Sequence, residues 1–469
     1  MMRARILLTL AAAALSACAT APEHRVPEID PGAGWTLAPE DAQVDVDLSR
    51  WWASFGDETL ERLIEQALTQ NLDIRQADAR VAEARAMRSA AAGGRYPVGD
   101  AGASVVRRRQ SETGPLPIRR IPELERDQTI YEPRFDAAWE PDFFGRTRSA
   151  VAAAEARAEN AVEQRRGVQL AIAAETARSY FSLRGAQHEL DARRAAVEAA
   201  RESVLLVRRR FEAGDAPEAA LVQAEAELRG LEAQLPTLEA AVRTTALAIG
   251  LLLGERPEAE LALIERHEDF VTLAPVPVGE RADLLRRRPD VRAAERALAA
   301  ATADLGIATA ELFPRVTLGA GAGFQSLSTG TLLDSASQIA TAALSISWRV
   351  LDGGRVRAEI EAGEARVEAA ALEYERSVLQ ALSDAEQALA RYQFGLAAVD
   401  LQAAAVDAAR RNREFADLRF RAGDISLLEL LDAERVLRNA EDAYARVHTL
   451  AATDLVALFK ALGGGWREG

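Results

Sequence analysis

The chain has 469 residues, a formal net charge of −15 and a single cysteine. An acidic chain lacks the positive surface that binds nucleic acid, and one cysteine excludes a disulfide framework within the chain. Because the four histidines are scattered without metal-ligand spacing, and no phosphate loop or nucleophile motif is present, we expect no cofactor, no metal site and no enzyme activity.

The first 17 residues read as a secretory signal peptide. Two arginines precede Ile6–Leu15, an apolar stretch of ten residues that is too short to span a membrane. The ending Leu15-Ser16-Ala17-Cys18 resembles the lipobox of bacterial lipoproteins, in which the cysteine receives a covalent lipid and becomes the first residue. Ala19 differs from the aspartate of an inner-membrane retention signal, which favours the outer membrane. The alternative is an ordinary signal peptide with a chance cysteine.

Residues 18–50 are expected to form an extended arm, because four prolines between positions 22 and 39 prevent one continuous helix. Helical periodicity starts after Trp51-Trp52 and continues to about Ala92. Gly93-Gly94 and Pro97 then end this first helical stretch.

Two pairs of β-strands are predicted, within about 97–140 and about 314–350. In 316–324 and 339–350, apolar side chains alternate with small or polar ones, the period of a strand with two different faces. Each strand would have roughly 10 residues, enough for a tilted membrane-spanning strand. Aromatic residues near the strand ends would suit a membrane interface: Trp139, Phe313 and Trp348. The alternative is a pair of soluble hairpins packed on helices.

Four strands cannot close a membrane barrel alone. An open sheet edge cannot face lipid, and the smallest ordinary barrel has about eight strands. If these strands cross a membrane, several chains must therefore share one barrel, and long helices below it would enclose a tunnel.

A long helical run follows each strand pair. Arg146–Phe211 and Arg355–Phe420 lack proline, and apolar residues in the second run recur on average every 3.6 residues, roughly the α-helical period. A glycine then follows that can take the left-handed conformation that ends a helix. We expect hairpin tips formed by Arg210, Phe211, Gly214 and Asp215, and by Arg419, Phe420, Arg421, Gly423 and Asp424. The alternative is ordinary coiled-coil packing. It explains the apolar residues that recur along one face of the helix, but not the segments with β-strand periodicity between the helices.

The two halves of the chain are related by fixed spacings. An offset of 209 relates Gly214 to Gly423, Trp139 to Trp348 and Arg146 to Arg355; an offset of 217 relates Asp73 to Asp290 and Pro97 to Pro314. Ordered matches at two offsets indicate a duplicated domain, with one loop longer in the first copy. We assign repeat 1 to residues 51–272 and repeat 2 to residues 273–469.

Together these features resemble the TolC-like outer-membrane efflux proteins, in particular the NodT-type lipoprotein branch that serves resistance-nodulation-division (RND) pumps. The most specific parts are the lipobox, the opening Trp51–Asp57, and the tips Arg210–Glu227 and Arg419–Glu434. The resemblance extends to Leu458, over nearly all of the mature chain. It implies a mainly α-helical fold in a homotrimer, with a shared 12-stranded outer-membrane β-barrel, a periplasmic α-barrel and tips that meet an adaptor and an inner-membrane pump.

The family also carries acidic residues that face the tunnel axis after the second tip. The matching residues here are Glu429 and Asp432, which are three apart and therefore share one helix face. Alternatively, both point to solvent on an amphipathic helix. The chain departs from the family at Ala220, where many relatives have an acid, and at Phe420, which lacks a hydroxyl. Other residues that would close the tip are Asp215, Glu218, Arg419, Arg421 and Asp424.

The function that the resemblance implies is a passive exit duct for drugs or other small molecules. Alternatives are a channel for type I protein secretion or metal-ion export, and an envelope coiled-coil lipoprotein without a pore. Of three methionines, two precede the lipobox, so the mature chain has no ladder of soft metal ligands. The sequence does not specify the transported substrate, because the pump mainly selects it.

Overall fold

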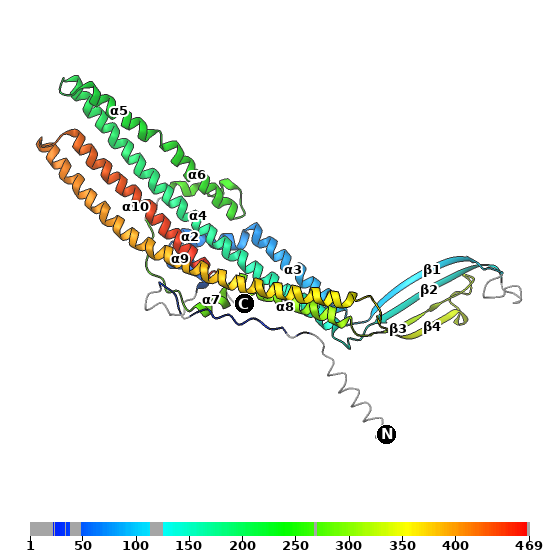
Figure 1. The fold of residues 1–469 in the computed structure, drawn as a ribbon. Coiled ribbons are helices and arrows are strands. Elements are labelled where there is room, and N and C mark those ends of the chain that lie inside the picture. The colour runs from blue at the N-terminus through cyan, green and yellow to red at the C-terminus, as the bar shows by residue number, and fades with distance from the viewer. Residues whose placement is uncertain are drawn as a thin grey trace. The chain divides into compact units, whose positions relative to one another are not determined.

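The computed structural model describes residues 22, 24–32, 34–37, 48–112, 125–266 and 270–466. The predicted signal peptide, Cys18 and part of the predicted arm lie outside these residues. Within them the chain is mainly α-helical, with one four-stranded antiparallel sheet (Figure 1). The predicted mainly α fold with a β contribution is therefore confirmed.

The elements follow the order expected from the sequence. They are η1 (Leu48–Phe55), α2 (Glu58–Gln70), α3 (Leu72–Gly93), β1 (Val98–Arg109), β2 (Asp127–Trp139), α4 (Arg146–Glu212), α5 (Glu218–Glu232), α6 (Leu235–Leu252), η3 (Pro257–Glu265), α7 (Arg281–Arg287), α8 (Pro289–Ala310), β3 (Arg315–Phe324), η4 (Ser335–Ser337), β4 (Gln338–Ser347), α9 (Arg355–Ala422) and α10 (Leu427–Ala461). Helices α3 and α8 start 217 residues apart, and α4 and α9 start 209 apart, so the sequence spacings recur as structural elements.

The return arms of the two hairpins differ. Helix α10 is one helix of 35 residues, whereas the corresponding part of the first half is divided into α5 and α6. The division lies next to Pro236, at the start of α6, because proline has no N–H and its ring clashes with the carbonyl four residues earlier. Residues 218–252 include an 18-residue window that is apolar enough to cross a membrane by composition, and within this stretch the chain forms two helices.

The chain forms two compact units, and each repeat contributes to both. The first unit includes residues 82–160 and 295–373 and contains the sheet with the adjoining parts of α3, α4, α8 and α9. The second includes 28–81, 161–294 and 374–469 and contains the two helical hairpins and the shorter helices.

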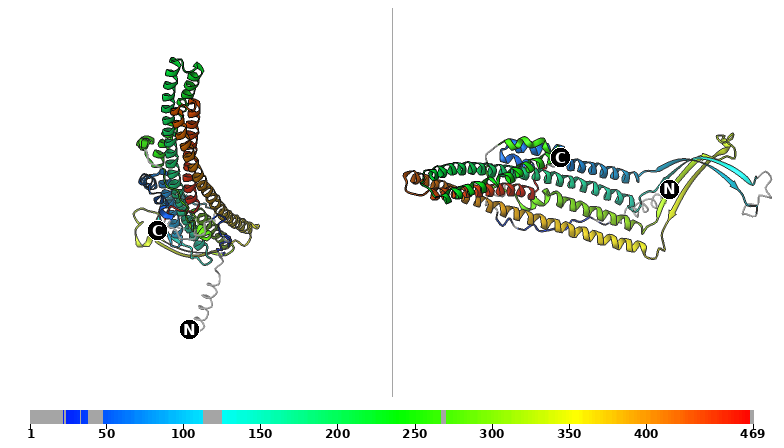
Figure 2. Two further views of the ribbon diagram at one scale, coloured as in Figure 1. Left: turned by 90° about the vertical axis from the view of Figure 1, so that its left-hand side faces the viewer. Right: turned by 90° about the horizontal axis from the view of Figure 1, so that it is seen from above.

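In the first unit the strands lie in the order β1-β2-β3-β4, side by side in a curved sheet (Figure 2). The two hairpins join where Arg134–Trp139 of β2 pairs with Leu318–Gly323 of β3. The register places Phe135, Leu318 and Leu344 on one face. The alternate positions of β2 carry Glu132, Arg134 and Asp136, with Arg134 bonded to both acids at 3.0 and 2.7 Å. Where the two hairpins pair, the sheet thus has one apolar and one polar face. Toward the end of the β1–β2 hairpin, Arg109 and Asp127 lie on the same face as Phe135 and form an ion pair at 3.7 Å.

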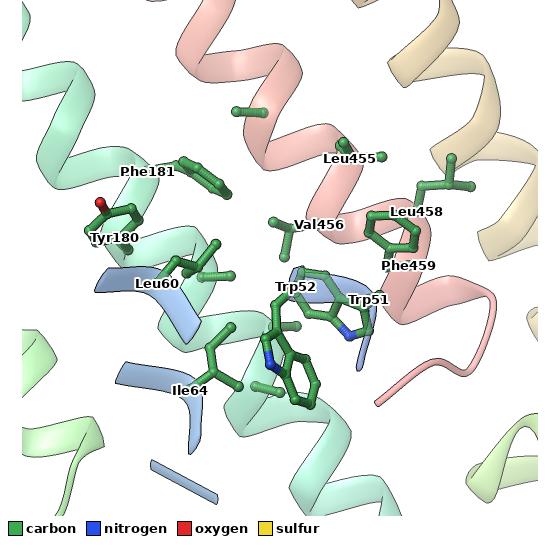
Figure 3. Packing of buried hydrophobic residues seen from close by; sticks show 14 of the residues in the cluster. Trp51, Trp52, Leu60, Ile64, Tyr180, Phe181, Leu455, Val456, Leu458 and Phe459 are labelled. Carbon is green, nitrogen blue, oxygen red and sulfur yellow. The ribbon is translucent and has the colours of Figure 1, made fainter. Parts of the chain in front are cut away.

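In the second unit, the tryptophan-rich opening is part of the hydrophobic core. Trp51 is 2% exposed and stacks on Phe459 of α10, with 5.2 Å between ring centroids (Figure 3). Asp57 caps α2 by accepting from the Leu60 amide at 2.9 Å, and it also accepts from the Tyr180 hydroxyl at 2.6 Å. This segment therefore fixes the short helices against α4 and α10.

Candidate functional site

Both predicted tips are glycine turns of the same geometry. Gly214 and Gly423 have φ values of 82° and 83°, in the left-handed region. The Asp215 amide donates to the Arg210 carbonyl at 2.8 Å, and the Asp424 amide donates to the Arg419 carbonyl at 2.9 Å. Each of these hydrogen bonds spans six residues, as in a Schellman motif, so α4 and α9 both end in this motif. The chain then turns back into α5 and α10.

One described contact joins the two tips directly. The guanidinium carbon of Arg210 lies 5.4 Å from the centroid of the Phe420 ring. Such a cation–π contact contributes about 0.5–1 kcal/mol at an exposed site. Both residues were expected at the tips, but no pattern in the sequence predicts that they meet. Phe420, which has no hydroxyl group, therefore contacts Arg210 through the face of its ring.

The two hairpins lie side by side (Figure 1). The described ion pairs that join α4 to α10 lie away from the tips. Near the base, Arg193 of α4 pairs with Asp442 of α10 at 2.7 Å, and both side chains are largely buried. Arg446 also pairs with Glu189 at 3.5 Å. Near the tips, the ion pairs run within single hairpins and are partly exposed: Arg208–Glu225 at 2.7 Å and Arg413–Glu434 at 3.5 Å. Exposed pairs contribute about 0–1 kcal/mol each.

Glu429 has a structural role at the start of α10. Its carboxylate accepts from the Ser426 amide and the Ser426 hydroxyl, both at 2.8 Å, and its own amide donates to the Ser426 oxygen at 3.3 Å. This reciprocal pair is a capping box. The bonds from Ser426, backbone first, lower the pKa of Glu429, and the charge of Arg419 acts in the same direction. Glu429 therefore remains charged at neutral pH.

Asp432 is paired differently. It accepts from Arg435, one turn further along α10, at 2.5 Å, and both side chains are exposed. Donating this hydrogen bond to Asp432 raises the pKa of Arg435, and the charge of Glu227 on α5 acts in the same direction. Arg435 is therefore a cation near two carboxylates from different hairpins. Arg435 was not among the predicted site residues, although its (i, i+3) spacing from Asp432 is a signal for pairing.

The remaining predicted tip residues have local roles in the described structure. Arg421 pairs with Asp417 of its own helix at 2.9 Å. Glu218 starts α5, where Pro217 is the N-cap and supplies no side-chain hydrogen bond. Phe211 is partly exposed, at 39%. The predicted lipid attachment site, Cys18, lies outside the described residues.

The described residues contain no group of three or more potential metal ligands. What the structure does gather at the tips is charge: Glu429 and Asp432 on α10, Arg435 beside them, and Arg210 against Phe420. Such an arrangement can attract ions and bind a charged partner.

The chain is similar in sequence to known outer-membrane efflux proteins. The family model described as outer membrane efflux protein matches residues 63–255 and 281–464. A probable efflux pump outer membrane protein of Pseudomonas putida, SepC, is 30% identical over 99% of this chain and 98% of its own length. A pyoverdine export outer membrane protein of the same species, OpmQ, is 31% identical over 97% and 96%.

Solved structures show the same fold. The outer-membrane channel OprN is 34% identical, with a TM-score of 0.85 over 96% of this chain and all of that chain. The two family matches cover most of the chain and include both hairpin tips. The chain therefore belongs to the outer membrane efflux protein family and is a channel of the outer membrane that serves efflux.

Proposed function

We propose that three copies of this chain form the exit duct of a tripartite efflux system. The observation that carries the proposal is the open sheet, whose outer strands β1 and β4 each have one unpaired edge among the described strands. Unpaired backbone groups are not tolerated against lipid, so neighbouring chains must supply the missing partners. Three sheets of four strands make a barrel of 12, within the range of outer-membrane barrels.

The polar face of each sheet then lines the lumen, and the apolar face contacts lipid. The helical hairpins extend the conduit into the periplasm, where their tips meet a periplasmic adaptor and an inner-membrane RND pump. The duct is passive and has no enzyme activity or cofactor. Relatives are named for efflux pumps and for pyoverdine export, so one architecture serves different cargoes. We infer that the pump selects the substrate.

The conductance of the purified protein in a planar bilayer tests the proposal. We expect discrete channels, and we expect chemical cross-linking in detergent to stop at three chains. In a trimer, Glu429 and Asp432 supply six carboxylates around one axis, and like charges a few ångströms apart repel by roughly 1 kcal/mol per pair in water. Glu429→Gln with Asp432→Asn should therefore lower cation selectivity and weaken block by multivalent cations.

The double variant should keep the fold, because glutamine can replace glutamate at the N3 position of a capping box. Asp407→Asn on α9, whose side chain is 70% exposed, is the matched control and should leave selectivity unchanged. Absence of conductance would refute the duct. Unchanged selectivity in the double variant of a conducting channel would instead show that these two carboxylates do not line the pore.

We also propose that Cys18 carries the lipid that anchors the mature N-terminus in the outer membrane. Cys18→Ser should give an unlipidated chain whose helical hairpins and sheet still form, because the buried hydrophobic core and the strand pairs are built from Leu48 onward. Mass spectrometry of the mature N-terminus measures the modification directly. An unmodified cysteine in the wild-type protein would contradict this proposal.

A further inference from the structure

Where the helices join the sheet, three arginines pair with one carboxylate. The Glu311 carboxylate, just after α8, lies 3.4 Å from Nε of Arg146 on α4 and 3.8 Å from a terminal nitrogen of Arg349, just after β4. It also pairs with Arg315, the first residue of β3. A second carboxylate, Glu140, is 3.4 Å from Arg146. The arginine cluster, defined as Arg146, Arg315 and Arg349, therefore keeps one net positive charge after both carboxylates are counted.

The arginine cluster has more hydrogen-bond donors than its described contacts use. A guanidinium carries five N–H groups. Among the described hydrogen bonds, Arg146 donates one, to Glu140. Arg315 donates one, to Glu311, and Arg349 contributes only its ion pair. The three arginine side chains are 34–45% exposed, whereas Glu311 is 16% exposed. A solute can therefore reach donors that these contacts leave available.

Neighbouring aromatic residues hold the cluster in place. Phe144 stacks on Phe313 with 4.9 Å between ring centroids, which fixes the start of α4 against the residues that follow α8. The Trp348 indole donates to the Leu312 carbonyl at 3.0 Å, which fixes the neighbouring Arg349. All of these residues belong to the first compact unit. Groups that are already positioned lose less conformational entropy when they bind a ligand.

The cluster lies at one end of the polar face of the sheet. Arg134, on that face, is opposite Gly323 of β3. Arg315 and Gly323 are an even number of positions apart on the same strand, so Arg315 shares the face of Arg134. This is the face that lines the lumen in the proposed duct. A solute that moves between the helices and the barrel would therefore pass the cluster.

The first repeat makes the same junction without this cluster. Trp139, which is 209 residues before Trp348, donates its indole N–H to the Arg95 carbonyl at 3.1 Å. Arg95 is in turn 217 residues before Leu312, so the hydrogen bond recurs at matching positions. The positions that match the carboxylate and two of the arginines hold other residues: Gly94 for Glu311, Val98 for Arg315 and Glu140 for Arg349. Because the junction forms without these charges, folding alone does not explain them.

We propose that Arg146, Arg315 and Arg349 form a binding site for a doubly charged oxyanion, the sulfate or phosphate-ester group of a solute in the conduit. Guanidinium groups bind such anions through paired, charge-assisted hydrogen bonds. Glu311 holds the arginines together, and its negative charge opposes an incoming anion. The assignment to a solute rests on the proposed function, because it requires the polar face to line a lumen. Anion binding by the cluster does not.

Calorimetric titration of the full-length protein in detergent with sodium sulfate tests the site. About 0.01 M chloride keeps electrostatic screening weak. R315Q/R349Q should weaken sulfate binding by about tenfold or more for each arginine removed, the size of a hydrogen bond to a charged group. E311Q should instead bind sulfate more tightly, because it removes the opposing charge and keeps an amide of similar shape. A purely structural role for these residues predicts no such gain.

The matched control is R355Q/R357Q, which removes two exposed arginines at the start of α9, outside the cluster. This control should retain the affinity of the wild type, and an equal loss would show only a general attraction of sulfate to positive surface. That outcome overturns the site, as does a wild-type protein that does not bind sulfate, or a folded E311Q protein that binds it no more tightly. If E311Q does not fold, the two arginine variants decide.

Two further measurements separate the source of the anion from the duct itself. Sulfate should lower the single-channel conductance of the wild type more than that of R315Q/R349Q. A protein that binds sulfate but does not conduct would refute the duct and leave the anion site standing. Mixed micelles that contain phosphatidylglycerol should not displace sulfate. Displacement would identify the ligand as a lipid headgroup and overturn the assignment to a solute.

Discussion

Gly323→Ala is expected to prevent the two β-hairpins of one chain from pairing. A Cβ at this position would lie 2.4 Å from the Pro133 carbonyl oxygen and 2.8 Å from the Arg134 Cα. Both are backbone atoms of β2, so a change of side-chain rotamer cannot relieve the clash. Overpacking of this kind costs about 1–3 kcal/mol. Here the cost falls on the pairing of β2 with β3, which holds the sheet together.

The expected result is a large loss of assembled channel, measured as the cross-linked oligomer in the outer-membrane fraction and as conductance per milligram of protein. Gly102→Ala in β1 is the matched control, because an added Cβ there meets no atom within 4 Å. That control should assemble normally. Equal yields of the two variants would mean that the strands can separate enough to admit a methyl group without loss of the sheet.

Trp51→Ala should cause the largest loss of stability in the helical unit. The indole is 2% exposed, stacks on Phe459 and contacts the rings of Trp52 and Phe55 edge-on. Removing a buried aromatic side chain costs about 3–5 kcal/mol, from lost burial together with the cavity that remains. Urea unfolding in detergent, followed by circular dichroism of the helices, measures the change.

Leu251→Ala on α6 is the comparison, because this leucine is 67% exposed. An exposed truncation of this kind should change stability by no more than about 0.5 kcal/mol. Trp51→Phe should fall between the two, since a smaller ring keeps part of the stack on Phe459. Similar midpoints for Trp51→Ala and Leu251→Ala would show that the core relaxes around the missing indole.

The helices and strands were predictable because apolar residues recur at the spacing typical of each element, and this spacing is visible in a short stretch of sequence. Alternation in 316–324 and 339–350 anticipated β3 and β4, although β4 ends at Ser347 and residues 348–350 lie outside the strand. Proline-free runs anticipated α4 and α9. The break between α5 and α6 was not anticipated, although Pro236 marks it. The neighbouring stretch is otherwise rich in helix-forming residues, and in the second half the matching helix is continuous.

The tip residues were predictable, but their partners were not. The resemblance placed Glu429 and Asp432 at the start of the last long helix, and the structure adds the capping bond to Ser426 and the pair with Arg435. The contact between Arg210 and Phe420 joins residues 210 positions apart, and no local pattern encodes it. The same is true of Glu311, whose partners Arg146 and Arg349 meet only through the tertiary fold.

The divided return arm of the first hairpin makes the two tips of one chain mechanically unequal. A force applied at the Gly423 turn passes along the unbroken α10 to Phe459 and the tryptophan core. A force applied at the Gly214 turn reaches the joint between α5 and α6 after 15 helical residues and can be absorbed there by bending. We therefore expect the return arm of the first hairpin to bend more easily than that of the second when a force acts on both tips.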